Sequence, residues 1–449
     1  MRLAMTAAAL CGALAVGNVS AKVSPEDAAR LGKDLTPIGA EKAGNKEGTV
    51  PAWDGGLTKA PACFKPGGRY CDPFPDDQPL YTITSQNAAQ YAKVLTPGQK
   101  AMFAKHAGYK MVVYPSRRTL ALPQHVYDAT RANATRASLG GNGEAVNDAA
   151  IGIPFPIPAN GHEVIWNHKL RYRGEGGRHF NNQFAVTTAG SYNQVTLRED
   201  IAINYSRKDA TPQNIDNVAI YFLQVVTAPT RLAGTITLVH ETMDQVREPR
   251  RAWQYNPGQR RLRRAPNVGY DNPGTASDGL RTNDQYDAFN GAMDRYSWKL
   301  AGKQEVIVPY NGYRLASGDH KYEDIMKKSF INQDLPRYEL HRVWVVDSVT
   351  KPGTTHLYKR RTFYVDEDTW GILLADVYDR RDQLWRWQES HPIMYYDRGF
   401  IGIAGETIYD LQSNRYLSQN FSNEHPELTD DRFPPSYFEP ASVSKQAIR

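Results

Sequence analysis

The chain has 449 residues, of which 41% are hydrophobic, and its formal net charge is +6. This length and apolar content can support a large core in one or two domains. The charge is modest and no recognisable basic module concentrates it, which argues against a nucleic-acid-binding protein. The 26 tyrosines, 8 tryptophans and 35 glycines favour a β-rich fold.

Residues 1–21 are predicted to be a secretory signal peptide. Arg2 precedes an apolar run over residues 7–16, and Val19-Ser20-Ala21 fits a small-residue cleavage site. We therefore expect export with cleavage near Ala21, and a retained N-terminal anchor is the alternative. Later in the chain no apolar run approaches the length of a membrane-spanning helix.

Cys63 and Cys71 are the two cysteines that remain after such a cleavage. They flank a Pro-Gly-Gly turn in a chain that we expect to be exported, so they predict a small disulfide loop. Two free thiols are the alternative.

Residues 22–150 are expected to form an extended arm and helices that pack on the body of the protein. Ser24-Pro25-Glu26-Asp27 has the cap, proline and acidic residues of a helix start. Residues 33–80 are rich in Gly, Pro and Lys and indicate the irregular arm. Further on, the pattern predicts helices over residues 85–95, 96–108 and 123–139, and a short strand over 109–114.

Residues 151–425 are expected to form a strongly curved antiparallel β domain with capping helices, so that the fold class is mainly β (α+β). Prolines punctuate the apolar segment 151–158, which is either a rigid loop over the core or the lip of an apolar cavity. A helix over 161–170 follows, and the remaining elements are predicted as follows: strands over 184–188, 193–205, 218–227 and 234–242, a helix over 288–300, and a strand over 303–311.

Residues 340–393 give the clearest pattern, four strands in succession with short turns. An antiparallel meander without crossover helices curls into a barrel or half-barrel. One more strand is expected near residues 405–417, and residues 426–449 are predicted to be a polar, proline-containing tail.

The segment Arg250 to Pro266 carries six arginines on either side of Trp253 and Tyr255 and is predicted to be a hairpin. A two-residue loop at Pro257-Gly258 would place Tyr255 opposite Arg260 and Trp253 opposite Leu262, whereas a longer loop would shift this register. The arginines either form a cationic, aromatic-lined surface for an anionic or amphipathic ligand, or pair with acids on neighbouring strands.

Motifs of known enzymes are missing from the sequence: it has no Gly-x-Ser-x-Gly elbow, no His-Glu-x-x-His and no dinucleotide fingerprint. His162, His168 and His179 have no metal-ligand spacing, so we predict no metal and no cofactor. Acids cluster at residues 366–368 and at Asp376, Asp379 and Asp382, where turns favour aspartate for local hydrogen bonds. A pair of these acids acting in glycan hydrolysis stays open.

Several motifs resemble a Gram-negative exported family of unassigned function that is often labelled "outer-membrane lipoprotein-sorting protein". The resemblance covers nearly the whole mature chain and brings no activity with it. It implies a periplasmic protein that works in envelope transport, since family members resemble proteins found beside large inner-membrane exporters. The motifs are Ser24-Pro25-Glu26-Asp27-Ala28, Leu35 to Ala40, Pro51-Ala52-Trp53-Asp54-Gly55-Gly56, Pro154 to Pro158, Trp166-Asn167-His168, Trp253 to Arg261 and Thr369-Trp370.

The family is more distantly similar to the LolA and LolB carriers, in which a curved sheet and its covering helices enclose an apolar cavity for acyl chains. This chain is much longer, with an added N-terminal region. We therefore expect a non-enzymatic carrier of a lipid-like or other hydrophobic molecule. The expected cavity or lip residues are Phe155, Trp166, Trp253, Tyr255, Leu262, Trp344, Phe363 and Leu373.

Arg260, Arg261, Arg263 and Arg264 are the candidates for binding an anionic headgroup or a protein partner. An envelope transporter or an outer-membrane protein is the partner that the resemblance implies. Two alternatives remain: an assembly factor for an outer-membrane or exporter complex, and a glycan- or lipid-acting envelope hydrolase that uses acids such as Asp376 and Asp379.

Overall fold

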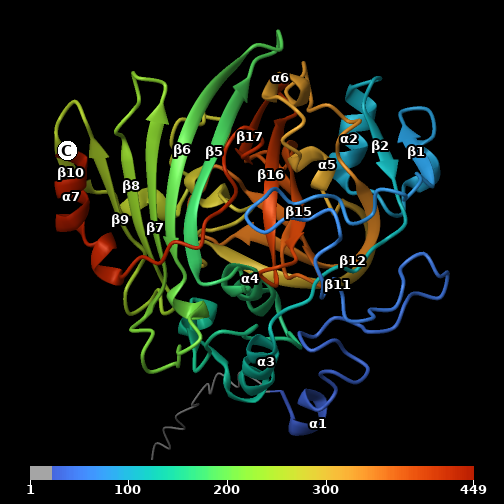
Figure 1. Cartoon of the computed structure of the whole chain (residues 1–449), viewed down its shortest axis with the longest axis horizontal. Coiled ribbons are helices and arrows are strands. Elements are labelled where there is room, and N and C mark those ends of the chain that lie inside the picture. Colours follow the sequence, from blue (N-terminus) through green and yellow to red (C-terminus); the bar gives the residue numbers. More distant parts are fainter. Residues whose placement is uncertain (1–22, 449) are drawn as a thin grey trace, which may run out of the picture.

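A single sheet of 15 strands dominates the computed structural model, which describes residues 23–448 (Figure 1). The strand order is β1-β2-β12-β13-β14-β15-β16-β17-β5-β6-β7-β8-β9-β10, with β11 paired to β12, and the sheet does not close into a barrel. The predicted signal peptide and its cleavage site lie outside the described residues. Within residues 23–448, no helix combines the length and the apolar character needed to cross a bilayer.

The elements of the N-terminal region and of the first half of the sheet are short helices followed by long strands. They are α1 (Pro25–Ala28), β1 (Tyr81–Thr84), α2 (Pro97–Lys105), β2 (Lys110–Val113), α3 (Gln124–Arg136), β3 (Ser138–Gly140), β4 (Ala145–Asn147), α4 (Gly161–Leu170), β5 (Gly176–Val186), β6 (Tyr192–Ala202), β7 (Val218–Ala228), β8 (Ile236–Thr242), β9 (Arg251–Asn256) and β10 (Arg261–Arg264). β3 and β4 form a separate two-stranded sheet.

The second half of the sheet is the predicted antiparallel meander, extended by three further strands. Its elements are β11 (Tyr296–Pro309), α5 (Tyr313–Ala316), α6 (Tyr322–Ile325), β12 (Tyr338–Thr350), β13 (Arg360–Asp366), β14 (Ile372–Tyr378), β15 (Leu384–Tyr395), β16 (Phe400–Asp410), β17 (Arg415–Phe421) and α7 (Pro440–Ile448). Every neighbouring pair from β11 to β17 is antiparallel, which confirms the meander.

β17 occupies the middle of the sheet and joins its two halves. It pairs with β16 on one side and with β5 on the other, where Tyr416 lies opposite Val186. The single strand expected near residues 405–417 was wrong, because Asp410 accepts bonds from the backbone N–H of Gln412 and Ser413 and turns the chain between β16 and β17.

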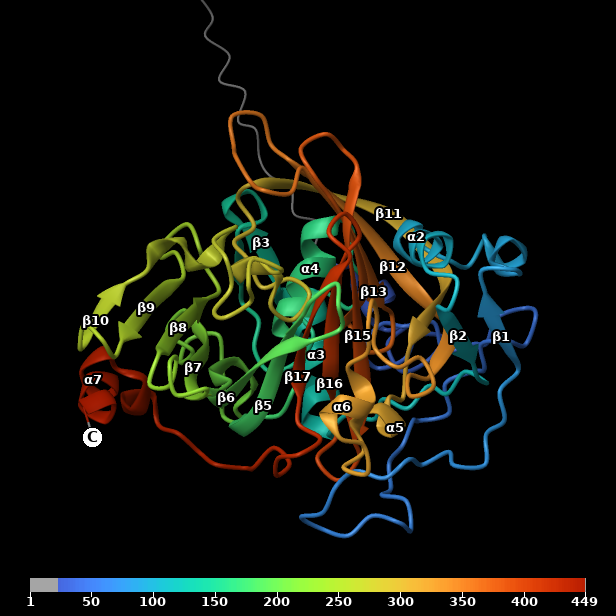
Figure 2. The same ribbon diagram turned by 90° about the horizontal axis from the view of Figure 1, so that it is seen from above.

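The curved sheet bends around helix α4 (Figure 2). Phe363 and Val365 of β13 share a hydrophobic cluster with Val164 and Ile165 of α4. Tyr364, between them in sequence, faces a second cluster with residues of α2 on the opposite side of the sheet. Alternate side chains of a strand point to opposite faces, so helices cover this part of the sheet on both faces.

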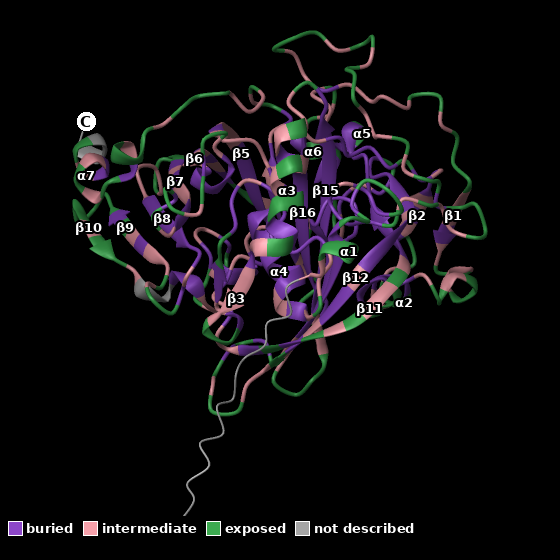
Figure 3. Cartoon of the chain, turned by 90° about the horizontal axis from the view of Figure 1, so that it is seen from below, coloured by how far each residue is buried: buried purple, intermediate pink, exposed green. Residues whose placement is uncertain are grey.

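Burial is greatest in the central strands, whereas β10 at the end of the sheet is mostly exposed (Figure 3). In β14 every residue is buried, while Arg261, Arg263 and Arg264 of β10 are exposed. The ends of the chain extend the sheet and its covering: β1 and β2 from the N-terminal region join it, and α7 from the tail packs against β8, β9 and β10.

Capping signals located the N-terminal helices well. Ser24 accepts a bond from the backbone of Asp27, and Thr96 and Gln99 form the predicted capping box of α2. The arm over residues 33–80 contains no strand, and the Cys63–Cys71 disulfide is present, as predicted.

Two predicted helices were wrong. Residues 85–95 form only a 3-10 turn over Ala88–Tyr91. Residues 288–300 are irregular until β11 begins at Tyr296. Tyr296 and Trp298 are buried while Ser297 and Lys299 are exposed, so the true period here is two, and the apolar residues share one face of a strand.

The hairpin of β9 and β10 has the longer of the two possible loops. Leu262 lies opposite Tyr255 and Arg264 opposite Trp253, so the pairing expected from a two-residue loop was wrong. Four residues form the loop, and Arg260 within it has a positive φ of 49°. The shift nevertheless leaves Trp253, Tyr255 and Leu262 on the same face, where they pack with Phe438 and Val443.

Candidate ligand-binding cavity

A cavity of about 200 Å³ lies between the inner face of β6, β7 and β8 and the segment of residues 268–290, which we call the covering segment. β16 and the residues that follow α4 complete its wall. Its apolar lining includes Ile201, Ile203, Ile220, Phe222, Val239, Val268, Tyr395, Phe400, Ile403 and Leu428. The concave side of the sheet thus offers an apolar surface to a ligand.

Strand alternation explains which side chains reach this cavity. Residues 199 and 201 of β6, 220, 222 and 224 of β7, and 237, 239 and 241 of β8 all line it, and each set is spaced by two. The registers place Leu223 opposite Asp200 and Leu238, on the other face of the sheet. Since alternate residues point to one face, three neighbouring strands build a continuous wall.

The polar part of the lining contains four arginines and three carboxylates. They are Arg171, Arg173, Arg250, Arg281, Glu199, Glu241 and Asp287.

Two ion-paired groups attach the covering segment to the sheet and to α4. Arg171 and Arg173 share Asp287, at 2.6 and 2.8 Å. Arg250 binds Glu241 through both carboxylate oxygens, at 3.0 and 2.5 Å, and also donates to the backbone carbonyl of Asn290. These contacts hold the covering segment just after Tyr286, at Asp287 and Asn290.

Tyr286 itself lies across the cavity from the sheet and binds Glu199. Its hydroxyl donates to the two carboxylate oxygens at 2.9 and 3.0 Å, and Gln224 donates to one of them at 2.8 Å. Burial raises the pKa of Glu199, and burial lowers the pKa of His179 to about 4, so the imidazole is neutral at physiological pH. This end of the cavity is therefore polar.

Arg281 is the one cavity arginine without an ion pair to a described carboxylate. The residue is 4% exposed, and its Nε has no hydrogen-bond partner among residues 23–448. Its remaining contacts are a bond to the Thr282 carbonyl at 3.3 Å and the Tyr286 ring, 5.5 Å from the guanidinium carbon. Burial lowers the pKa of Arg281, because the charged form has lost solvent.

None of the eight residues predicted for a cavity or lip lines this cavity. Phe155, Trp166 and Phe363 are buried in the main core. Leu373 belongs to the cluster on the opposite face, and Trp253, Tyr255 and Leu262 pack against α7. Trp344 lines a separate hollow under the N-terminal arm, where Lys303 lies 4.6 Å from its ring. A ligand contact of any of them stays a prediction.

The cavity residues could be found only in part from the sequence. The strands 193–205, 218–227 and 234–242 were predicted, and their period of two places Ile201, Ile220 and Val239 on one face or the other. Nothing local says which face is concave. Arg281 lies in a loop segment, where the sequence pattern does not predict the direction in which a side chain points.

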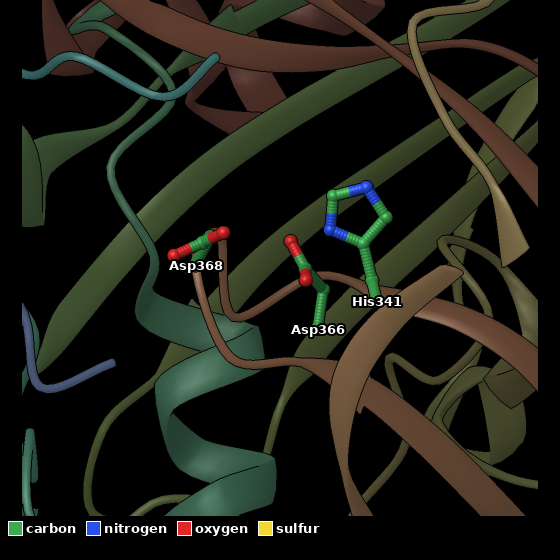
Figure 4. Close-up of side chains that lie close together, drawn as sticks. All are labelled: His341, Asp366 and Asp368. Atoms are coloured by element: carbon green, nitrogen blue, oxygen red, sulfur yellow. The ribbon is translucent and has the colours of Figure 1, made fainter. Parts of the chain in front are cut away.

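A second cluster of titratable groups is buried where β13 ends. His341, Asp366 and Asp368 each present a possible ligand atom within 4.8 Å of the others, with Asp366 between the other two (Figure 4). Both oxygens of Asp368 accept bonds from Arg118, at 2.7 and 2.8 Å, and His341 Nε2 lies 2.9 Å from Glu339. Burial and the nearby Asp368 raise the pKa of Asp366 to about 6.

This cluster fixes the N-terminal arm to the sheet. Arg118 also donates to the backbone carbonyls of Glu41, Lys42 and Pro51. A cation bound between these residues would have to displace Arg118 from Asp368. We therefore interpret the cluster as a structural ion network, which the sequence showed only as acids in a turn.

Asp376 and Asp379, the acids named for a hydrolase, have different local hydrogen-bond partners. Asp376 is buried on β14 and accepts bonds from the Tyr364 hydroxyl and the Gly98 backbone N–H, both at 2.9 Å. Asp379 accepts bonds from the backbone of Arg381 and Gln383 in its own turn. Each acid thus has a local structural role.

Comparison with known proteins gives one family. A family model described as "Protein of unknown function (DUF1329)" matches residues 82–448. A curated protein of Pseudomonas aeruginosa, itself described as uncharacterized, is 50% identical over 436 residues, which is 96% of this chain and 95% of that protein.

Solved structures are similar at lower identity. A putative outer membrane lipoprotein-sorting protein domain from Vibrio parahaemolyticus is 14% identical, with a TM-score of 0.43, over 63% of this chain and 97% of that one. A DUF1329 family protein from Desulfovibrio piger is 16% identical, with a TM-score of 0.43, over 60% and 92%. A LolA superfamily protein from Nitrosomonas europaea is 10% identical, with a TM-score of 0.38, over 63% and 98%.

Proposed function

This chain belongs to the DUF1329 family of proteins of unknown function, and from that premise we propose that it is a non-enzymatic binding or carrier protein for a lipid-like or other hydrophobic molecule. It acts in the envelope, in the periplasm after cleavage near Ala21. The observation that supports the proposal is the cavity whose apolar wall comes from three adjacent strands and β16.

Ion pairs and hydrogen bonds hold the covering segment over this apolar surface. The covering segment is attached through ion pairs of Asp287 and Glu241 and through the Tyr286–Glu199 bonds. An apolar molecule that enters releases water from both surfaces, at about 25 cal/mol for each Å² buried. Concave, mostly apolar sites with a few fixed polar groups are where proteins bind small ligands.

Native mass spectrometry with organic extraction tests the proposal on mature protein purified from its own periplasm. We expect a bound lipophile in near-stoichiometric amount. A fluorescent fatty-acid probe should bind the wild type and fail to bind Ile220→Trp, which fills the cavity. Val246→Trp is the matched control, since Val246 is 59% exposed. An empty protein that also binds no probe would refute the carrier function.

A partner-binding role, as an assembly factor for an envelope complex, is the second candidate. Its support is that β10 ends the sheet and that Arg260, Arg261, Arg263 and Arg264 are exposed, with no ion pair to a described carboxylate. Arg250 and Arg251, by contrast, pair with Glu241 and Glu248. The double change of Arg260 and Arg261 to Glu should abolish capture of an envelope partner while probe binding persists. Unchanged capture would refute this role.

A further inference from the structure

Arg281 is a buried cation of the cavity lining that forms no ion pair with a carboxylate of the described residues. Its guanidinium lies against Gly274, where an added Cβ would come within 2.6 Å of the guanidinium carbon. The backbone around it is fixed, because the Arg281 carbonyl accepts bonds from the Gly274 N–H at 2.9 Å and from the Ser277 hydroxyl at 3.2 Å. The side chain is thus positioned before any ligand arrives.

None of the described carboxylates near this cation binds it directly, although the charges of Glu199 and Glu406 partly offset the lowering of its pKa by burial. Glu241 is bound by Arg250, and Asp287 is already shared by two arginines. Glu199 is bound by Tyr286 and Gln224, and the pKa of its carboxyl is raised by burial. A buried charge is costly unless it is paired, so a ligand anion would relieve a cost that the protein alone does not relieve.

Arginine suits an oxyanion, because its planar fork can donate two parallel bonds to a carboxylate. The apolar wall of Ile201, Ile220 and Val239 belongs to the same cavity. We propose that the cargo is an amphiphile with an anionic oxyanion head, such as a fatty-acid carboxylate, and that Arg281 binds its head while the alkyl chain lies on the apolar wall. This inference rests on the proposed carrier function and adds the chemical class of the cargo.

Three ligands that share the same ten-carbon chain and differ only in the headgroup test which head the mature wild-type protein prefers. Decanoate, decanol and decylamine are titrated by calorimetry at a pH well above the pKa of the free acid. Decanoate should bind about ten- to a hundredfold more tightly than decanol, as expected for charge-assisted hydrogen bonds in a buried site. Decylamine should bind less tightly than decanol.

Variants show which residue causes the preference for decanoate over decanol. Arg281→Gln should bring decanoate down to the affinity of decanol, and urea unfolding followed by tryptophan fluorescence shows whether the variant is folded. Arg281→Lys should keep part of the preference, and Arg261→Gln, on the exposed hairpin, should keep all of it. If Arg281→Gln does not fold, the wild-type series and Arg281→Lys still decide the question.

The outcomes separate this inference from the proposed function. If none of the three ligands binds, the carrier function is refuted and this inference with it. If decanol binds as tightly as decanoate to the wild type, the carrier function stands and the anionic head is refuted. If Arg281→Gln is folded and keeps the preference for decanoate, the assignment to Arg281 is refuted.

Discussion

Asp287 joins the covering segment to the residues after α4, and its replacement by asparagine should be strongly destabilising. Its side chain is 14% exposed, and those of Arg171 and Arg173 are 5% and 27% exposed. Burial opposes ionisation of Asp287, but the charges of Arg171 and Arg173 outweigh it and hold the pKa of the carboxyl well below its usual range. The neutral amide of Asp287→Asn would leave both cations in place without the charge that they share.

The size of the effect follows from the burial of these partners. Removing one partner of a buried ion pair costs about 3–5 kcal/mol, mostly because a charge is left unpaired. Asp382→Asn is the matched control, because Asp382 pairs with Arg360 at 3.0 Å in a pair whose side chains are 42% and 30% exposed. Such surface pairs contribute about 0–1 kcal/mol.

Urea unfolding followed by tryptophan fluorescence measures both variants. At neutral pH Asp287→Asn should lose about 3–5 kcal/mol and Asp382→Asn under about 1 kcal/mol. Because the folded-state pKa of Asp287 is depressed, its contribution is present above the unfolded pKa of about 4 and is lost as the pH falls towards the folded value. The difference between wild type and Asp287→Asn should therefore shrink in acid. A loss at neutral pH no larger than that of Asp382→Asn would refute the reasoning.

Three further changes test other parts of the structure. Burial raises the pKa of Asp376 to about 7, so the contribution of this carboxyl to stability falls as the pH rises from about 4 to about 7. Over that window the stability of Asp376→Asn, measured by urea unfolding, should rise relative to that of the wild type by up to about 4 kcal/mol. A difference that stays constant with pH would contradict this. Arg118→Met should free the N-terminal arm, measured as faster proteolytic cleavage within residues 41–56. Arg117→Met removes a side chain that is 44% exposed and should leave cleavage unchanged. Equal cleavage in the two variants would contradict the assigned role of the ion network. Phe438→Ala should lower the free energy of unfolding by about 3–5 kcal/mol and release the C-terminal helix, because the ring is fully buried against β7. A loss under about 1 kcal/mol would show that the tail is not part of the core.

The strands were predictable from the sequence wherever side chains alternate or turns are short. The meander from β12 to β15 carried both signals, and α4 was predicted at its observed bounds, Gly161–Leu170. β11 was partly mistaken for a helix, although Tyr296 and Trp298 are spaced by two, as on one face of a strand. The four-residue loop before Arg261 was left open, since Pro257-Gly258 suits more than one loop length.

The candidate site was not predictable to the same degree, because its residues meet only through long-range pairing. Asp287 and Arg171 are far apart in sequence, and their ion pair depends on the path of an irregular segment. Aromatic residues such as Trp166 and Phe363 suggested a ligand cavity, yet they fill the core, which is the commoner fate of large apolar side chains. The cavity is instead lined by aliphatic residues and by other aromatic residues, such as Phe222 and Phe400, which the sequence did not single out.

The central position of β17 has a consequence for how the chain reaches its folded state. β17 is the last strand of the sheet to be synthesised, yet β5 and β16 both depend on it for their hydrogen bonds. A chain truncated after Asp410 would present two unpaired strand edges, and such edges recruit strands from other molecules. The contacts that join the halves span more than two hundred residues, and distant contacts form slowly because a long loop must close first. Chains that lack β17 should therefore aggregate rather than remain as smaller folded units, and a full-length chain would need protection until its last strand is in place.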